Sequence, residues 1–116
     1  FTERADGREW FMTGIIWCNT FIEGAEQLER IEEQYKAMGI KPIEKNKSIS
    51  HYSIIFENED YWKVVISTEN ARGHKCNISY ISRQIPLSVI KTIIFPCTRA
   101  LAYTAYHYYG DPVGED

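Results

Sequence analysis

A polar segment in the second half of the chain holds residue types suited to binding phosphate. Residues 70–75 read Asn-Ala-Arg-Gly-His-Lys, so three side chains able to carry positive charge surround a glycine, which adopts backbone angles closed to other residues. Arg72 could bind phosphate through two parallel hydrogen bonds, Gly73 could expose amides, and His74 could donate a hydrogen bond or stack on a base. The side-chain amide of Asn77 could form hydrogen bonds with the polar edges of a base. For an isolated Arg-Gly pair, a solvated turn between strands is the more common situation.

Two further arginines extend this candidate ligand set. Arg83 follows a predicted strand, and Tyr103 comes four residues after Arg99, a spacing that puts both on one face of a helix. An arginine beside a tyrosine can pair with a phosphate while the ring stacks on a base. An arginine whose stem lies on the core and whose head meets a carboxylate is about equally expected. The predicted ligand-binding residues are therefore Arg72, Gly73, His74, Asn77, Arg83, Arg99 and Tyr103.

The residue types needed for catalysis are present, but they lack the required spacings. His51, His74 and His107 are far apart in the sequence, and no two of them share a helix face, so we predict no metal site. No nucleophile elbow and no Gly-x-x-x-x-Gly-Lys-Ser/Thr loop occurs. Glu57 and Glu59 are read as a solvated turn rather than as a general acid and base. We therefore expect no catalytic residue, no cofactor and no enzymatic activity.

The elements that must position these residues follow from hydrophobic periodicity. Residues 10–20 are apolar on both alternating faces, which predicts a buried strand. From Gly24 apolar residues recur every three or four positions, which predicts an amphipathic helix that stops near Gly39, before Pro42. Residues 44–47 are predicted to form a loop.

The middle of the chain is rich in β-branched and aromatic residues. Residues 48–56 and 61–68 flank a polar turn and predict a β-hairpin. A second polar loop is predicted over residues 69–75. Residues 76–80 then alternate in polarity, which predicts a fourth strand with one polar face.

The C-terminal part is predicted to be helical. Pro86 suits a first helical turn, Pro96 should kink or interrupt the helix, and a helical segment should resume through Tyr108. The whole order predicts a single α+β domain over residues 1–116. In it, a mixed sheet is packed by an N-terminal amphipathic helix and a kinked C-terminal helical segment.

Composition sets limits on partners and compartment. A chain of 116 residues with a net charge of -3 lacks the basic excess of a duplex nucleic-acid binder, so no duplex nucleic acid is expected. Apolar runs are too short for a membrane span, and we expect no membrane partner. The three cysteines form no Cys-x-x-Cys pair, which favours buried thiols and a cytoplasmic location. The chain does not begin with Met, so an N-terminal segment could have been trimmed.

The C-terminal region also predicts self-association. Apolar residues cover more than one narrow stripe of the predicted helix, and several tyrosines follow it. One small sheet would not cover all of them. We therefore predict a homo-oligomer in which the C-terminal helices pack on partner subunits.

Five segments follow one another along the chain: residues 15–21 (IIWCNTF), an acidic helix, and residues 54–58 (IIFEN), 70–73 (NARG) and 78–81 (ISYI). This succession, over about half of the chain, resembles the middle of a phage terminase ATPase domain. It implies a degenerate nucleotide-binding domain. The family has a magnesium-binding acidic residue where Ser82 stands here, and the phosphate loop expected before the first strand is missing, so hydrolysis and DNA translocation are not expected.

At the level of overall shape, a second resemblance is to the first described family of Thoeris anti-defence sponges. These are compact phage proteins with a sheet, a long C-terminal helical part and sites between subunits. The resemblance implies a phage protein that sequesters a nucleotide-derived signal, of the cyclic ADP-ribose type or a cyclic oligonucleotide, in the host cytoplasm without cleaving it. The ligand residues named above come from their chemistry alone.

Three functional hypotheses follow. The preferred one is a non-enzymatic binder of a nucleotide-derived small molecule, without a cofactor, at sites between subunits. The first alternative is a protein-interaction domain, acting as an inhibitor or adaptor through its acidic helix and aromatic C-terminal surface. The last is a metal-free enzyme that would use His74 or His51 as acid or base on a phosphodiester.

Overall fold

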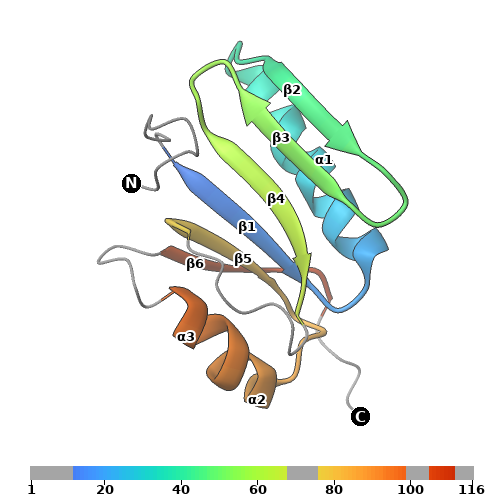
Figure 1. Cartoon of the computed structure of the whole chain (residues 1–116), viewed down its shortest axis with the longest axis vertical. Coiled ribbons are helices and arrows are strands. Elements are labelled where there is room, and N and C mark those ends of the chain that lie inside the picture. The colour runs from blue at the N-terminus through green and yellow to red at the C-terminus, as the bar shows by residue number, and fades with distance from the viewer. Residues whose placement is uncertain (1–11, 68–75, 99–104, 112–116) are drawn as a thin grey trace.

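The computed structural model describes residues 12–67, 76–98 and 105–111 and shows a mixed α+β fold (Figure 1). Within these residues, six strands form one sheet in the order β2-β3-β4-β1-β5-β6. The helical segments are α1, α2, the π-helical segment η2 and α3. The bounds of the strands are β1 (Thr13–Cys18), β2 (Pro42–Lys47), β3 (Tyr52–Phe56), β4 (Tyr61–Ile66), β5 (Ile78–Ser82) and β6 (Ala105–Tyr109). Those of the helical segments are α1 (Phe21–Ala37), α2 (Leu87–Val89), η2 (Ile90–Ile94) and α3 (Phe95–Thr98).

The sheet combines a parallel part with an antiparallel part. β1 is parallel to β4 and β5, and β5 is parallel to β6, whereas β3 is antiparallel to both β2 and β4. All six residues of β1 are buried, as expected for a strand covered on both faces. This confirms the predicted buried strand within residues 10–20, with the exposed Asn19 and Thr20 outside it.

Two hydrophobic clusters cover the two faces of the sheet. Ile16 packs with Leu28 and Ile31 of α1 on one face. Ile15 and Trp17 pack on the other face with the apolar residues of η2. Figure 1 shows α1 behind the β2–β4 part of the sheet and the orange helices beside β5 and β6. The connections after β1 and β5 therefore run over opposite faces.

The predicted amphipathic helix is confirmed and begins earlier than expected. α1 starts at Phe21 instead of Gly24 and ends at Ala37. Gly39 has a φ of 80°, a left-handed conformation that glycine adopts without steric cost, and the Ile40 amide donates to the Tyr35 carbonyl. The predicted stop near Gly39 is therefore correct.

The hairpin predicted over residues 48–56 and 61–68 is confirmed as β3 and β4, but the preceding loop prediction was wrong. Residues 44–47 belong to β2, an edge strand that pairs with β3. Its lysines reach α1, since Lys45 lies 3.0 Å from Glu32 and Lys47 lies 2.6 Å from Glu29. Strand pairing and these contacts outweigh the low β-propensity of the segment.

The fourth predicted strand is β5, but its polar side is not a solvent face. Ser79 is fully buried, and its hydroxyl accepts a hydrogen bond of 3.0 Å from Trp17 Nε1 and lies 3.1 Å from Cys76 Sγ. A buried hydroxyl is acceptable when it is hydrogen-bonded, so sequence polarity did not indicate exposure here.

The C-terminal helix prediction was correct as far as Thr98 and wrong for residues 105–108, while residues 99–104 lie outside the described residues. Helix continues through Pro96 because η2 precedes it, with the Phe95 amide bonded to the Ile90 carbonyl five residues back. Residues 105–108, predicted to be helical, belong to the strand β6 (Ala105–Tyr109) beside β5. Residues 105–109 therefore cannot supply the predicted helix that packs on a partner subunit. Of the helices described, none is long and apolar enough to cross a membrane.

Candidate functional site

The parallel strands β4, β1, β5 and β6 all end at one edge of the sheet, which we call the carboxyl edge. Cys18 is level with Ile66, and Ser82 is level with Tyr109. The chain leaves β1 for α1 on one face and leaves β5 for α2 on the other. In open α/β sheets, the crevice between two strands whose connections diverge in this way is the usual ligand site.

A carboxylate organises this edge. Glu23 Oε2 accepts hydrogen bonds from the amides of Asn19 at 2.7 Å and Thr20 at 3.1 Å, and Oε1 accepts one from the Ser82 hydroxyl at 2.7 Å. The Ser82 oxygen in turn accepts the Gln84 amide at 3.0 Å. Glu23 therefore ties the end of β1, the start of α1 and the end of β5 together, and it places negative charge where helix amides would otherwise attract an anion.

Next to Glu23 lies a cavity of about 260 Å³ between α1 and the end of β6. Gln84 Nε2 donates to the Asp111 carbonyl at 2.7 Å and closes one side. Arg30, whose Nη1 donates to Gln27 Oε1 at 3.0 Å, stands on another. The lining residues are Glu23, Glu26, Arg30, Gln84, Tyr109, Gly110 and Asp111.

The side chains beneath the carboxyl edge are neutral. The Cys18 thiol donates to the Val65 carbonyl at 3.6 Å, and burial raises the pKa of this thiol to about 12. The Tyr109 hydroxyl donates to the Trp17 carbonyl at 2.8 Å, and burial raises its pKa as well. Neither group ionises near neutral pH, so neither supplies an anionic nucleophile.

Two of the seven predicted ligand residues lie in the described parts of the chain, at opposite ends of β5. Arg83 is exposed at the carboxyl edge, and its amide donates to the Tyr109 carbonyl at 3.0 Å. Asn77 lies at the other end, where its Oδ1 accepts the Thr13 amide at 2.9 Å. The Asn77 side chain thus joins β5 to the start of β1. Arg72, Gly73, His74, Arg99 and Tyr103 lie outside the described residues.

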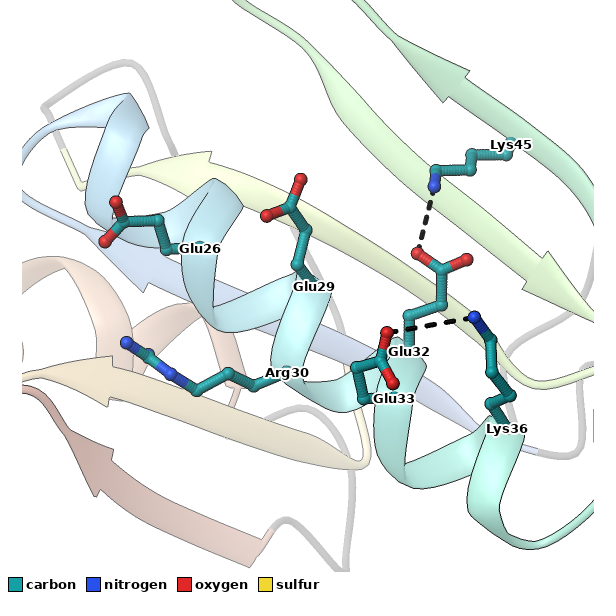
Figure 2. Close-up of a pocket in the computed structure, with 7 residues that line it drawn as sticks. All are labelled: Glu26, Glu29, Arg30, Glu32, Glu33, Lys36 and Lys45. Carbon is teal, nitrogen blue, oxygen red and sulfur yellow. Dashed lines mark hydrogen bonds and ion pairs between the residues drawn. The ribbon is translucent and has the colours of Figure 1, made fainter.

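A larger hollow, of about 610 Å³, lies over α1 and β2 (Figure 2). Its walls are exposed acidic and basic side chains, and Figure 2 shows Lys45 directed at Glu32 and Lys36 at Glu33. The Lys45–Glu32 pair links an edge strand to a helix, whereas Lys36 and Glu33 both belong to α1, and surface pairs of this kind contribute little each. The hollow is a charged surface formed by α1 and β2.

Sequence reasoning missed Glu23, Ser82 and Gln84 at the carboxyl edge. A signal existed for Glu23, since a threonine followed three residues later by a glutamate is the pattern of a capping box, and Thr20 and Glu23 have that spacing. Gln84 had no comparable signal. Gln84 takes part in this edge because it contacts the segment at the end of β6, which lies far along the chain.

Comparisons with known proteins give one partial match. No family model matches the chain, and no solved structure matches it. The chain is 31% identical over 78 residues to ribosomal RNA small subunit methyltransferase F of Vibrio campbellii. The match covers 65% of this chain and 16% of that protein, so the chain spans about a sixth of the length of the relative it matches.

Proposed function

We propose that this chain binds a nucleotide-derived small molecule at the carboxyl edge without cleaving it. The observation that carries the proposal is the divergence of the connections after β1 and β5, which creates a crevice at the ends of parallel strands. A cavity of about 260 Å³ suits a nucleoside-sized part of a ligand, whose remainder would extend over the open surface.

The chemistry of the edge supplies both kinds of contact that a nucleotide needs. Arg83 and Arg30 offer guanidinium groups for phosphate, and the carboxylate of Glu23 can accept ribose hydroxyls. The segment that contains Arg72 and His74 follows β4 in the chain, and β4 ends at this edge. Glu23 also keeps phosphate away from the start of α1, so we expect phosphate on the Arg83 side.

A nucleotide-derived signal, of the cyclic ADP-ribose type or a cyclic oligonucleotide, is the ligand we propose, held by a cytoplasmic homo-oligomer encoded by a phage. The end of β6, an edge strand, borders the cavity through Tyr109 and Gly110, so a neighbouring subunit could complete the site. The buried Cys18 and Cys76 thiols suit a reducing compartment.

A degenerate terminase-like nucleotide-binding domain is the second candidate, and one observation favours it. β5 lies parallel to β1 and ends in Ser82, the position at which that family carries an acid, and the Glu23 carboxylate lies 2.7 Å from the Ser82 hydroxyl. A linear nucleoside triphosphate would then be the ligand. The partial match to an rRNA methyltransferase covers 16% of that protein and supports neither candidate, nor methyl transfer.

Native mass spectrometry with a ligand panel tests the proposal. The panel contains cyclic ADP-ribose isomers, cyclic oligonucleotides and ATP. We expect the chain to retain one of them with its mass unchanged. Arg83→Ala should raise the Kd of the retained ligand about 10- to 100-fold, the effect of losing a charge-assisted hydrogen bond.

Lys91→Ala is the matched control, because Lys91 is an equally exposed cation on η2. The Kd of the retained ligand for the Lys91→Ala variant should equal that for the unchanged chain. Retention of ATP in place of a cyclic compound would favour the terminase-like candidate. A ligand of altered mass would identify an enzyme, and no retained ligand would leave the protein-interaction alternative.

A further inference from the structure

The two outer strands of the sheet differ in how their free edges are protected. β2 carries Pro42 and the charged Glu44, Lys45 and Lys47, and proline and charge both discourage pairing with another strand. β6 reads Ala-Tyr-His-Tyr-Tyr and contains no Lys, Arg, Asp, Glu or Pro. It therefore lacks the proline and the Lys, Arg, Asp and Glu side chains by which many sheet edges avoid association.

The backbone of β6 shows which groups face outward. The Ala105 amide donates to the Asn77 carbonyl at 2.8 Å, and the Tyr109 carbonyl accepts the Arg83 amide at 3.0 Å. Because alternate residues of a parallel strand bond to the same neighbour, Ala105, His107 and Tyr109 direct their backbone groups to β5. The N–H and C=O groups of Tyr106 and Tyr108 consequently point away from β5, toward the side of β6 on which none of the described strands pairs with it.

We propose that β6 pairs with β6 of a second copy of this chain, antiparallel, with His107 on the twofold axis. In this register Tyr106 lies opposite the partner's Tyr108, and the two residues exchange both of their outward backbone hydrogen bonds. A shift of one residue would set outward groups against groups already bonded to β5. The register centred on His107 is therefore the one that uses the whole strand.

The side chains of β6 suit this pairing. The Tyr106 ring packs edge-on against Phe95 with centroids 5.1 Å apart, and its hydroxyl bonds to Thr98, so it is fixed. Tyr108 lies on the same face and is 47% exposed. The pairing would place this ring beside the partner's Tyr106, an aromatic cross-strand pair. On the other face His107 stacks on Tyr80, with centroids 5.0 Å apart.

The symmetry of the contact explains why the occupant is a second copy. A strand without Lys, Arg, Asp or Glu meets its own copy without repulsion between such side chains, and a twofold contact closes on itself as a dimer. A contact between β6 and β2 would be head-to-tail and open-ended, and it would have to accommodate Pro42 and the lysines of β2. This inference gives a structure to the homo-oligomer of the proposed function, and the mass of the ligand-free chain tests it separately from ligand binding.

Analytical ultracentrifugation of the whole chain tests the dimer. At about 100 µM we expect a mass twice the 13.5 kDa of one chain, falling toward one chain on dilution. Tyr108→Pro removes an outward N–H that β5 does not use, so the variant should fold, by circular dichroism, and stay monomeric at the same concentration. Tyr108→Ala loses the same ring but keeps the N–H, and should still dimerise.

Amide hydrogen exchange of the native chain gives a second test that needs no variant. The amides of Tyr106 and Tyr108 should be protected at high concentration and exchange freely on dilution, whereas the Ala105 amide, bonded to β5, should change little. A single-chain mass at about 100 µM would overturn the proposal. So would a dimer whose Tyr106 and Tyr108 amides exchange like exposed ones, or one that survives in a folded Tyr108→Pro.

Discussion

At the scale of single residues, Glu23 has the most consequences. Its carboxylate accepts two backbone amides at the start of α1 and the hydroxyl of the buried Ser82. The Ser82 contact joins Glu23 to a residue 59 positions along the chain. Glu23 therefore acts as a structural anion inside the crevice where we expect a ligand.

Replacing Glu23 with glutamine should weaken the fold. The amide keeps the shape of the side chain but loses the charge and replaces one accepting oxygen by a donor, so Glu23→Gln should lower the free energy of unfolding by about 1 to 2 kcal/mol. Urea denaturation measures the loss. Glu33→Gln on the exposed side of α1 is the control and should cost less than about 0.5 kcal/mol. Equal losses in both variants would contradict the role given to Glu23.

Residue types alone selected candidate residues, but they did not show where the fold places them. Arg83 was selected for its charge and does lie at the carboxyl edge. Asn77 was selected for its amide, which instead bonds the backbone of Thr13. The sequence does not show that residue 77 lies beside residue 13, because that proximity depends on the pairing of β1 with β5. Whether a polar side chain near a strand end stabilises the fold or is available to a ligand depends on which groups the fold places beside it.

At the scale of elements, α1 is tied to the hairpin by a buried polar cluster. The Tyr35 hydroxyl donates to Asp60 Oδ2 at 2.7 Å and accepts from Trp62 Nε1 at 2.9 Å. The Tyr35 ring also stacks on Phe56, with centroids 3.9 Å apart. One side chain of the helix thus fixes the turn and both strands of the hairpin.

Removing the Tyr35 hydroxyl should therefore loosen helix and hairpin together. Tyr35→Phe leaves the buried Trp62 N–H without this acceptor, and the free energy of unfolding should fall by about 1 to 3 kcal/mol in urea denaturation. Tyr52→Phe provides a comparison, since its hydroxyl makes a longer bond of 3.4 Å to Glu32. A smaller loss for Tyr35→Phe than for Tyr52→Phe would refute the anchoring role.

The elements predicted wrongly are both at the edges of the sheet. β1, α1, β3, β4 and β5 have periodic apolar residues because they contact the core directly. β2 is intermediate or exposed at every position, and β6 at all but its last, so periodicity carries little information about them. Their strand conformation comes from pairing with β3 and β5, which a local reading of sequence cannot include. The aromatic content of β6 was a usable hint of strand.

At the scale of the whole molecule, the fold buries a thiol and two tyrosine hydroxyls, and burial favours their protonated, neutral forms. Burial raises the pKa of Cys18 to about 12 and also raises those of Tyr35 and Tyr109, all three being nearly inaccessible to solvent. The ordinary values are 9.0 for cysteine and 10.0 for tyrosine. Above pH 9 the unfolded chain thus loses protons that the folded chain retains.

Stability should accordingly be constant from neutral pH to about pH 9 and then fall. Since the native state binds more protons there, the free energy of unfolding should decrease by up to about 1.4 kcal/mol per pH unit for each group involved. Urea denaturation at several pH values between pH 7 and pH 11 measures this decrease in the free energy of unfolding. Tyr35→Phe should have a shallower alkaline slope. A native chain whose stability rises above pH 9 would show that these groups are not held neutral.

The π-helical turn η2 determines the angular phase of the helix that follows it. A residue of α-helix advances by about 100°, so the extra residue in such a turn rotates everything after it by that angle. Phe95 and Thr98 follow η2, and both meet Tyr106 of β6. In an unbroken α-helix from Leu87 the same two side chains would be rotated away from that ring. The position of the outermost strand thus depends on a phase offset set several residues earlier. Deleting one residue of η2 would remove the π-helical turn and keep Phe95 and Thr98 facing Tyr106, whereas inserting one more residue would rotate them away from the sheet edge.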